Sequence, residues 1–376
     1  MKTSGISGNE MYCLNKLALK PGQVAVGNSV FSLGMVGSFI SGVKNFVGGE
    51  VSQISSFIQE GRHLAIQRLE NEAKNLGEIG ITDVSTKLIH HQETSNIEFL
   101  SIGSGLYKQV SEDQSFFSSS CDGTELYCNI DANYIPKKFV FGNVAYAIGA
   151  VGGIMGALRT LKRGEVKEYS QILNHTRHLA LDRIIEDAKA SGANAVLNIE
   201  TEIVSYMPGV TEMLMIGTSS LNSHLPEEYL NSPVTSDLTS TELWSITKMG
   251  YIPMKLVLGT SVYSLGVVGG ITSAFKSIFR GEISELTTLV YEARENAISL
   301  ISKEAEQIGA DDVIGVKTYM YELGGGMIEF MAIGTAVKKI EGVKTVSEEL
   351  IPQAIISDKA TFFNSTRYEA LGGLMG

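Results

Sequence analysis

The chain carries three copies of one pattern, and this internal repeat limits its fold more than any other feature. The stretch Glu10–Cys13 recurs at 125–128 and, in altered form, at 242–245. Three arginines and three glycines followed by Ser or Thr also match between copies: Arg62, Arg177, Arg294, Gly103, Gly217 and Gly334. The period of about 115 positions is too long for one unit of a solenoid. The sequence therefore predicts tandem domains that share one fold.

We place the domains at residues 10–107, 125–222 and 242–340, followed by a C-terminal tail at 341–376. A chain of 376 residues has room for two to four domains at roughly 100–200 residues each. The connections at 108–124 and 222–241 are rich in small polar residues, as linkers and turns commonly are. The first copy is the most diverged, and the tail matches nothing in the repeat.

The second copy shows the expected elements most clearly. Residues 138–144 are apolar and β-prone, which predicts a strand, and a Gly-rich apolar stretch with a small helix follows at 145–161. Apolar residues recur with helical spacing across 166–190, which predicts an amphipathic helix that packs on a flat surface. Strands at 195–204 and 212–219 would form a hairpin. Each copy is thus expected to be a two-layer α+β domain, with a long helix on an antiparallel sheet.

The composition argues against some classes of function. The net charge is −11, whereas proteins that bind nucleic acid through its phosphates need clustered Lys and Arg. There are three cysteines and no CxxC pair, which favours a reducing compartment over a disulfide framework. The first ten residues are polar and lack the apolar core of a signal peptide, so we expect a cytoplasmic protein.

A family likeness rests on residues matched in order and spacing. The third copy carries Arg280-Gly281, Ala293-Arg294, Gly309–Gly315 and Gly334–Val337, and the second copy keeps most of this pattern. In these residues each copy resembles the YbjQ family of heavy-metal-binding domains. The resemblance implies a dodecin-like β-α-β-β fold, assembly into rings that are commonly pentamers, and no established catalytic residues. Three fused copies depart from the single copy that is usual in the family, which leaves the ring stoichiometry open.

Three segments without a charged residue also depart from the family pattern, at 21–43, 139–158 and 256–275. Each is about as long as a membrane span, and glycines such as Gly149 and Gly153 repeat at a spacing that lets helices approach closely. We interpret each segment as a strand followed by a short Gly-rich helix, buried between copies or subunits. Contact with a membrane surface and a transmembrane helix are the two alternatives.

The long helices carry side chains of metal-ligand type at matched positions, and residues three apart share a helix face. These pairs are Glu60 with His63, His175 with His178, and Glu292 with Glu295, and Asp182 extends the second pair. Such side chains bind divalent transition metals such as zinc, copper or nickel, so they are the candidate metal ligands. In the alternative interpretation they are ordinary solvated residues, because they oppose the apolar stripe of the helix. Two residues on one helix cannot complete a tetrahedral site, so a metal site would need several helices brought together.

The leading hypothesis is a non-enzymatic, self-assembling homo-oligomer that binds a heavy metal or a small ligand. The competing hypothesis is a structural or membrane-associated scaffold assembled through the uncharged Gly-rich segments. No GxSxG elbow, phosphate-binding loop or HExxH motif supports an enzyme. The three matched arginines are interpreted as ion-pair or interface residues, and Cys13 and Cys128 as packing residues.

Overall fold

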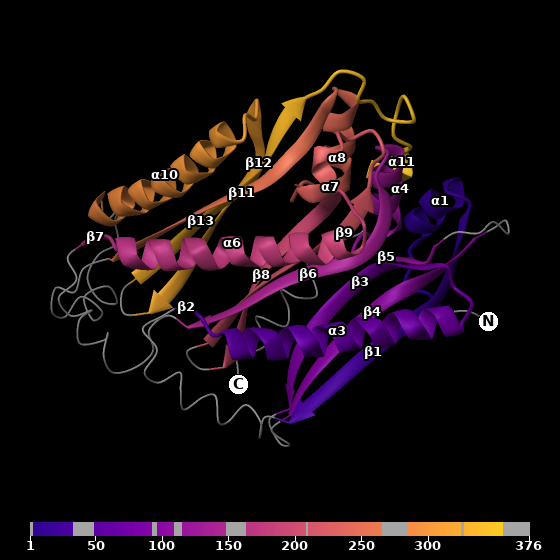
Figure 1. Cartoon of the computed structure of the whole chain (residues 1–376), viewed down its shortest axis with the longest axis horizontal. Coiled ribbons are helices and arrows are strands. Elements are labelled where there is room, and N and C mark those ends of the chain that lie inside the picture. The colour runs from indigo at the N-terminus through magenta and orange to yellow at the C-terminus, as the bar shows by residue number, and fades with distance from the viewer. Residues whose placement is uncertain are drawn as a thin grey trace.

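The computed structural model describes residues 3–32, 49–91, 96–108, 115–147, 163–207, 210–264, 284–324 and 327–355. All three copies follow one order of elements: a short helix, a long strand, a long helix and a hairpin of two long strands (Figure 1). The chain is therefore a mixed α+β protein built from a repeated unit, as the sequence predicts.

The bounds of the elements differ little between copies. The first copy contains α1 (Gly8–Lys16), β1 (Leu19–Ser32), β2 (Gly49–Glu50), α3 (Ser52–Asn75), β3 (Gly80–His91) and β4 (Asn96–Lys108). The second contains β5 (Phe117–Ser118), α4 (Gly123–Asp131), β6 (Ile135–Ala147), β7 (Gly164–Glu165), α6 (Lys167–Ala190), β8 (Ala195–Met207) and β9 (Val210–Leu221). The third, with the start of the tail, contains α7 (Glu228–Asn231), β10 (Val234–Thr235), α8 (Ser240–Lys248), β11 (Tyr251–Ser264), α10 (Ser284–Gln307), β12 (Asp312–Gly324), β13 (Met327–Lys339) and α11 (Pro352–Ile355).

The repeated Glu10–Cys13 motif lies in a short helix that the sequence analysis did not predict. Its glutamate is the third residue of the helix and completes a capping box with the residue before the helix. In this box the Ser7 hydroxyl accepts from the Glu10 amide, and the Glu10 carboxylate accepts from the Ser7 amide. The same box begins α4 with Asp122 and Glu125, and α8 with Thr239 and Glu242. Helix capping therefore explains why this glutamate recurs in every copy.

Each copy forms an antiparallel sheet in which the last strand lies between the first strand and its hairpin partner, in the order β1-β4-β3 for the first copy. Short strands then extend each sheet with residues of a neighbouring copy. Strands β2 and β7 each pair with the first long strand of the following copy, β6 and β11. Strands β5 and β10, at the start of the second and third copies, each pair in parallel with the preceding copy's sheet. Consecutive copies are thus joined by shared sheets as well as by the chain.

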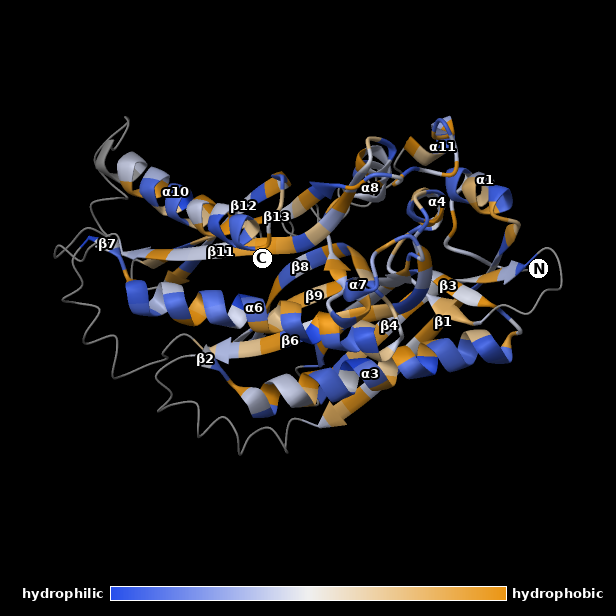
Figure 2. Cartoon of the chain, turned by 45° about the horizontal axis from the view of Figure 1, so that its top comes forward, coloured by the Kyte–Doolittle hydropathy of each residue, from blue (hydrophilic) through white to orange (hydrophobic). Residues whose placement is uncertain are grey.

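Helices and sheets alternate along the stack of copies (Figure 2). Helix α3 packs on β1 and β4 of its own copy and, on its other side, on β6 of the second copy. Helix α6 likewise packs on β6 and β9 of its own copy and on β11 of the third. The apolar cores therefore span copies: Phe139 and Phe141 of β6 belong to the same buried cluster as Ile66 and Leu69 of α3.

One glycine in each first strand lets the long helix approach the sheet closely. A Cβ atom on Gly142 would lie 2.1 Å from the carbonyl oxygen of Ala180, so no larger residue fits without moving α6. Gly27 and Gly259 meet α3 and α10 in the same way. The recurrence of this glycine therefore reflects helix-on-sheet packing.

The described parts of the three uncharged segments are strands: residues 21–32 lie in β1, 139–147 in β6 and 256–264 in β11. This agrees with the interpretation that each segment begins with a strand, while the expected Gly-rich helices lie outside the described residues. Among the residues that the structure describes, no helix is both long enough and apolar enough to span a membrane. The long helix predicted at 166–190 is confirmed as α6, and the hairpin strands are longer than predicted.

Candidate functional site

The three copies meet through two interfaces of the same design, which we call the inner interfaces. A buried arginine–glutamate pair lies in each: Arg62 Nη2 is 2.7 Å from Glu212 Oε2, and Arg177 Nη2 is 2.8 Å from Glu329 Oε2. The arginine comes from the long helix of one copy and the glutamate from the last strand of the next copy. Both glutamates lie five positions before the repeated glycine, at Gly217 and Gly334, so the two pairs occupy matched positions.

The second of these pairs is the more fully bonded. Arg177 donates through Nε and Nη2 to Glu329, and Nη2 also donates to the Tyr146 hydroxyl at 2.9 Å. Burial alone would lower the pKa of Arg177, but the adjacent carboxylate outweighs it and raises this pKa above its ordinary value. The Arg177 guanidinium therefore remains charged in a site without solvent. Such a pair contributes little net stability, yet it strongly disfavours any arrangement that separates its members.

Apolar side chains surround each pair. Strand β6 presents Phe139, Phe141 and Ala145 to the first copy, and all three are buried. Strand β11 presents Leu256, Leu258 and Val262 at the matched positions, again buried, in a cluster with Leu173 and Leu181 of α6. The inner interfaces thus combine an apolar stripe with one buried charge pair.

Two of the candidate metal ligands lie in these interfaces, at matched positions. The His63 ring lies 4.6 Å from the Phe141 ring, and burial lowers the pKa of His63 while Asp187 partly opposes this shift. His178 Nε2 lies 3.4 Å from Glu304 Oε2, and Lys255 lies 2.7 Å from the other oxygen. Burial lowers the pKa of His178, but bonds to Glu304 and to the Asn174 carbonyl outweigh it and raise this pKa overall. Both histidines contribute to contacts between copies.

The other candidate ligands lie apart from these contacts. His175, Asp182, Glu60, Glu292 and Glu295 are exposed on their helices. In the described part of the chain, no three His, Cys, Asp or Glu side chains come close enough to hold a metal ion. The assignment of metal ligands therefore stays a prediction.

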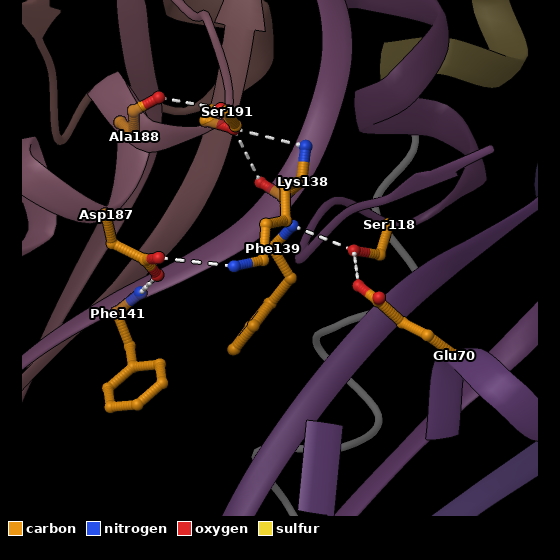
Figure 3. Close-up of polar contacts among 9 residues, drawn as sticks. Glu70, Ser118, Lys138, Phe139, Phe141, Asp187, Ala188 and Ser191 are labelled. Carbon is orange, nitrogen blue, oxygen red and sulfur yellow. Dashed lines mark hydrogen bonds and ion pairs between the residues drawn. The ribbon is translucent and has the colours of Figure 1, made fainter. Parts of the chain in front are cut away.

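A serine at the junction of the first two copies ties three elements together (Figure 3). The Ser118 hydroxyl of β5 donates to Glu70 of α3 at 2.8 Å and accepts from the Phe139 amide of β6 at 3.0 Å. At the next junction, the Thr235 hydroxyl of β10 accepts from the Leu256 amide in the same way. These hydroxyls satisfy strand amides that would otherwise be buried without a partner, and they fix how the linker enters the next copy.

The three cysteines are free and buried, in keeping with packing roles for Cys13 and Cys128. Burial raises the pKa of Cys13 to about 11 and that of Cys121 to about 12, so neither thiol is an activated nucleophile. The recurrence of Arg62 and Arg177 predicted their interface role, whereas Glu212 and Glu329 were not predicted from the sequence. Their constant spacing from the repeated glycine was the signal that could have identified them.

Comparison with known proteins identifies the repeated unit. The sequence profile of the YbjQ family, described as "Putative heavy-metal-binding", matches residues 17–103, 130–221 and 246–340. An encapsulin nanocompartment protein of Mycobacterium tuberculosis is 28% identical over 228 residues, which cover 58% of this chain and 84% of that protein. A UPF0145 protein of Picrophilus torridus is 41% identical over 97 residues, covering 24% of this chain and 82% of its own length. A UPF0145 protein of Methanocella arvoryzae is 35% identical over 96 residues, covering 26% and 78%.

Proposed function

The chain belongs to the YbjQ family, with three copies of the domain, and from this premise we propose that it is a non-enzymatic building block that assembles with copies of itself. The observation that carries the proposal is the inner interface, which occurs twice within one chain and joins copies of one fold in the same direction. A contact that runs from the helix of one unit to the sheet of the next can continue into another chain, because each end keeps an unused half.

The relatives support the same proposal. One of them is an encapsulin nanocompartment protein, which shares 28% identity with this chain, and the others match a single copy. Fusion of three copies raises their effective concentration, so two of every three contacts form without an encounter in solution. It also lets the end copies diverge from the middle one. We therefore propose a cytoplasmic scaffold or ring component rather than an enzyme.

The test is the mass of the untagged chain in solution, measured by light scattering after size-exclusion chromatography across a wide range of concentration. The proposal expects a discrete assembly heavier than one chain of 40.5 kDa. A mass of one chain at every concentration would refute it.

The heavy-metal role in the family description is a second proposal, supported by the ligand-type side chains at matched helix positions. Elemental analysis of the same sample, prepared without an affinity tag or chelator, tests it. Metal in constant ratio to protein that is lost when His175 and His178 are both replaced by Ala would support the proposal. Its absence from a well-formed assembly would refute it.

A further inference from the structure

We propose that the sheet face of the first copy binds the long-helix face of the third copy in a second chain, so that the inner interface is repeated between chains. This inference rests on the proposed self-assembly and names the surfaces that carry it. The first-copy face consists of Val24, Val26, Val30, Glu98, Leu100 and Ile102. The third-copy face consists of Val290, Arg294 and Ile298 on α10.

The first-copy face is exposed where its counterparts are buried. Val30 of β1 is 53% exposed, whereas the matched Ala145 and Val262 are fully buried against the preceding copy. Val24 and Val26 are exposed in the same way, although their counterparts Phe139, Phe141, Leu256 and Leu258 are all buried. On β4, Ile102 is exposed and Leu100 half-buried, and their counterparts are buried. The first copy thus presents, uncovered, the stripe that an inner interface covers.

The third-copy face shows the reverse side of the same contact. Val290, Arg294 and Ile298 are spaced four apart on α10 and match Leu173, Arg177 and Leu181 of α6. The residues of α6 are fully buried, as are Ile58, Arg62 and Ile66 of α3. On α10 the Arg294 side chain is 53% exposed, and Val290 and Ile298 are only half-buried. This helix face has the composition of the two buried ones, and in the described part of the chain it is the most exposed of the three.

The charges of the two faces are complementary. Glu98 lies five positions before Gly103 and so matches Glu212 and Glu329, the partners of the two buried arginines. In the single chain its carboxylate accepts from Asn28 at 3.1 Å and lies 2.8 Å from His91. Arg294 is 4.0 Å from its neighbour Glu295, and its side chain is 53% exposed. Docking of the two faces would place Arg294 on Glu98, as Arg177 lies on Glu329.

A hollow lies beside α8 of the third copy. It has a volume of about 270 Å³ and is lined by Leu238, Thr241, Glu242, Ser245, Ile246 and Gly315. Between the first two copies, the matched position of Glu242 is Glu10, whose carboxylate accepts from the Gly123 amide at the start of α4 at 3.2 Å. The matched residue at the start of α1 is Gly8, where an added Cβ would meet open space. A contact matched to the inner interfaces would place the first turn of α1 from a second chain in this hollow.

One position distinguishes the contact between chains from the inner interfaces. His178 meets Glu304 and Lys255 at the second inner interface. At the contact between chains the matched residues are Glu295, Glu72 and Gln23, so two carboxylates would lie side by side without a lysine. Like charges at close range oppose association. The contact between chains is therefore weaker than the inner ones, and the replacement Glu295→His strengthens it.

The stoichiometry follows from this contact. Because every chain contributes three copies and joins the next chain head to tail, a closed assembly holds copies in multiples of three. A pentamer of copies is excluded for complete chains that join in this way. The occupant of each free face is a second copy of this chain, since the chain itself carries the matching half.

The test uses native mass spectrometry of full-length chains with Glu98→Arg, Arg294→Glu or Glu295→His. Each of the first two variants would oppose like charges at the contact and raise the concentration of half-assembly about a hundredfold or more. When the Glu98→Arg and Arg294→Glu chains are mixed in equal amounts, they would assemble with the two variants alternating. Each contact between unlike chains then joins an arginine to a glutamate. Glu295→His would lower the concentration of half-assembly. Glu186→Arg, whose side chain is 71% exposed on α6, is the matched control and should assemble as the natural chain does.

The outcomes separate this inference from the proposed function. If the natural chain assembles and both charge variants assemble equally well, the self-assembly stands and the assigned surfaces are wrong. If the two variants stay folded by circular dichroism but do not reassemble when mixed, the surfaces are also wrong. If the natural chain stays monomeric at every concentration, the proposed function fails and this inference fails with it.

Discussion

The buried pair between Arg177 and Glu329 allows a quantitative prediction. Both side chains are fully buried, and the carboxylate receives bonds from Nε and Nη2 of the arginine. Replacing Glu329 by Leu leaves an uncompensated buried guanidinium, which costs about 3–5 kcal/mol. Replacing Arg177 by Met leaves a buried carboxylate and costs a similar amount. At about 2 °C per kcal/mol for a chain of this size, each single variant should melt about 6–10 °C lower.

The double variant Arg177→Met with Glu329→Leu removes both charges and keeps apolar side chains of similar bulk. It should be nearly as stable as the natural chain, or more stable, because the cost of desolvating two charges disappears with them. Urea unfolding followed by circular dichroism gives the four free energies of the cycle. If the double variant loses about the sum of the single losses, the pair is not coupled and the reasoning is refuted.

Arg294→Met is the matched control for this cycle. Arg294 occupies the same helix position as Arg177, but its side chain is 53% exposed. In dilute solution, below the concentration of assembly, the change should cost within about 0.5 kcal/mol, as surface substitutions usually do. A cost equal to that of Arg177→Met would show that helix position, rather than the buried partner, determines the loss.

Four further predictions concern the interfaces and the core. The pKa of His178 is raised in the folded chain, so its charged form stabilises the fold below the unfolded pKa, and this stabilisation is lost as the pH rises through the folded pKa. The replacement His178→Gln should therefore lower the melting temperature more at pH 5 than at pH 8. The pKa of His63 is lowered in the folded chain, so its contribution to stability is present above the unfolded pKa and is lost as the pH falls through the folded pKa. The replacement His63→Gln should therefore lower the melting temperature more at pH 8 than at pH 5. The same pH trend for both histidine variants would contradict these pKa shifts. Gly142→Ala should destabilise the chain by about 1–3 kcal/mol in urea unfolding, since its Cβ would lie 2.1 Å from the Ala180 oxygen, whereas a neutral result would show that α6 can move away. A thiol reagent should label none of the three buried cysteines in the native chain and all three in urea, and rapid native labelling would contradict their burial.

Local patterns predicted the architecture of each copy because they depend on residues close in sequence. The helical spacing across 166–190 gives α6, and the β-prone residues around Phe139 give β6. The short helices α1, α4 and α8 were missed because only nine residues form each of them, and their signal is a capping box rather than a periodicity. The pattern of expected elements predicted the mixed α+β class, whereas the dodecin-like detail that the family resemblance implies stays a prediction.

The interfaces could be predicted only in part, because the partners lie far apart in sequence. Arg177 was recognised as an interface residue from its recurrence, but Glu329 lies 152 positions away and nothing local connects the two. The helical wheel placed His178 opposite the apolar stripe, which suggested solvent. In the folded chain that side of α6 faces the third copy, so a position that is polar on the wheel is partly buried. A helix that is covered on both sides has two packed faces. The spacing of apolar residues in the sequence reveals only the more apolar of these faces.

A high-resolution structure of the assembled protein would test the contact between chains most directly, because it gives the separation between Arg294 and Glu98 of neighbouring chains. We expect a charge pair as close as the 2.7 Å and 2.8 Å of the two inner interfaces, with Val30 covered by α10 of the neighbouring chain. An assembly in which Arg294 and Glu98 both face solvent, or in which other surfaces join the chains, would contradict it.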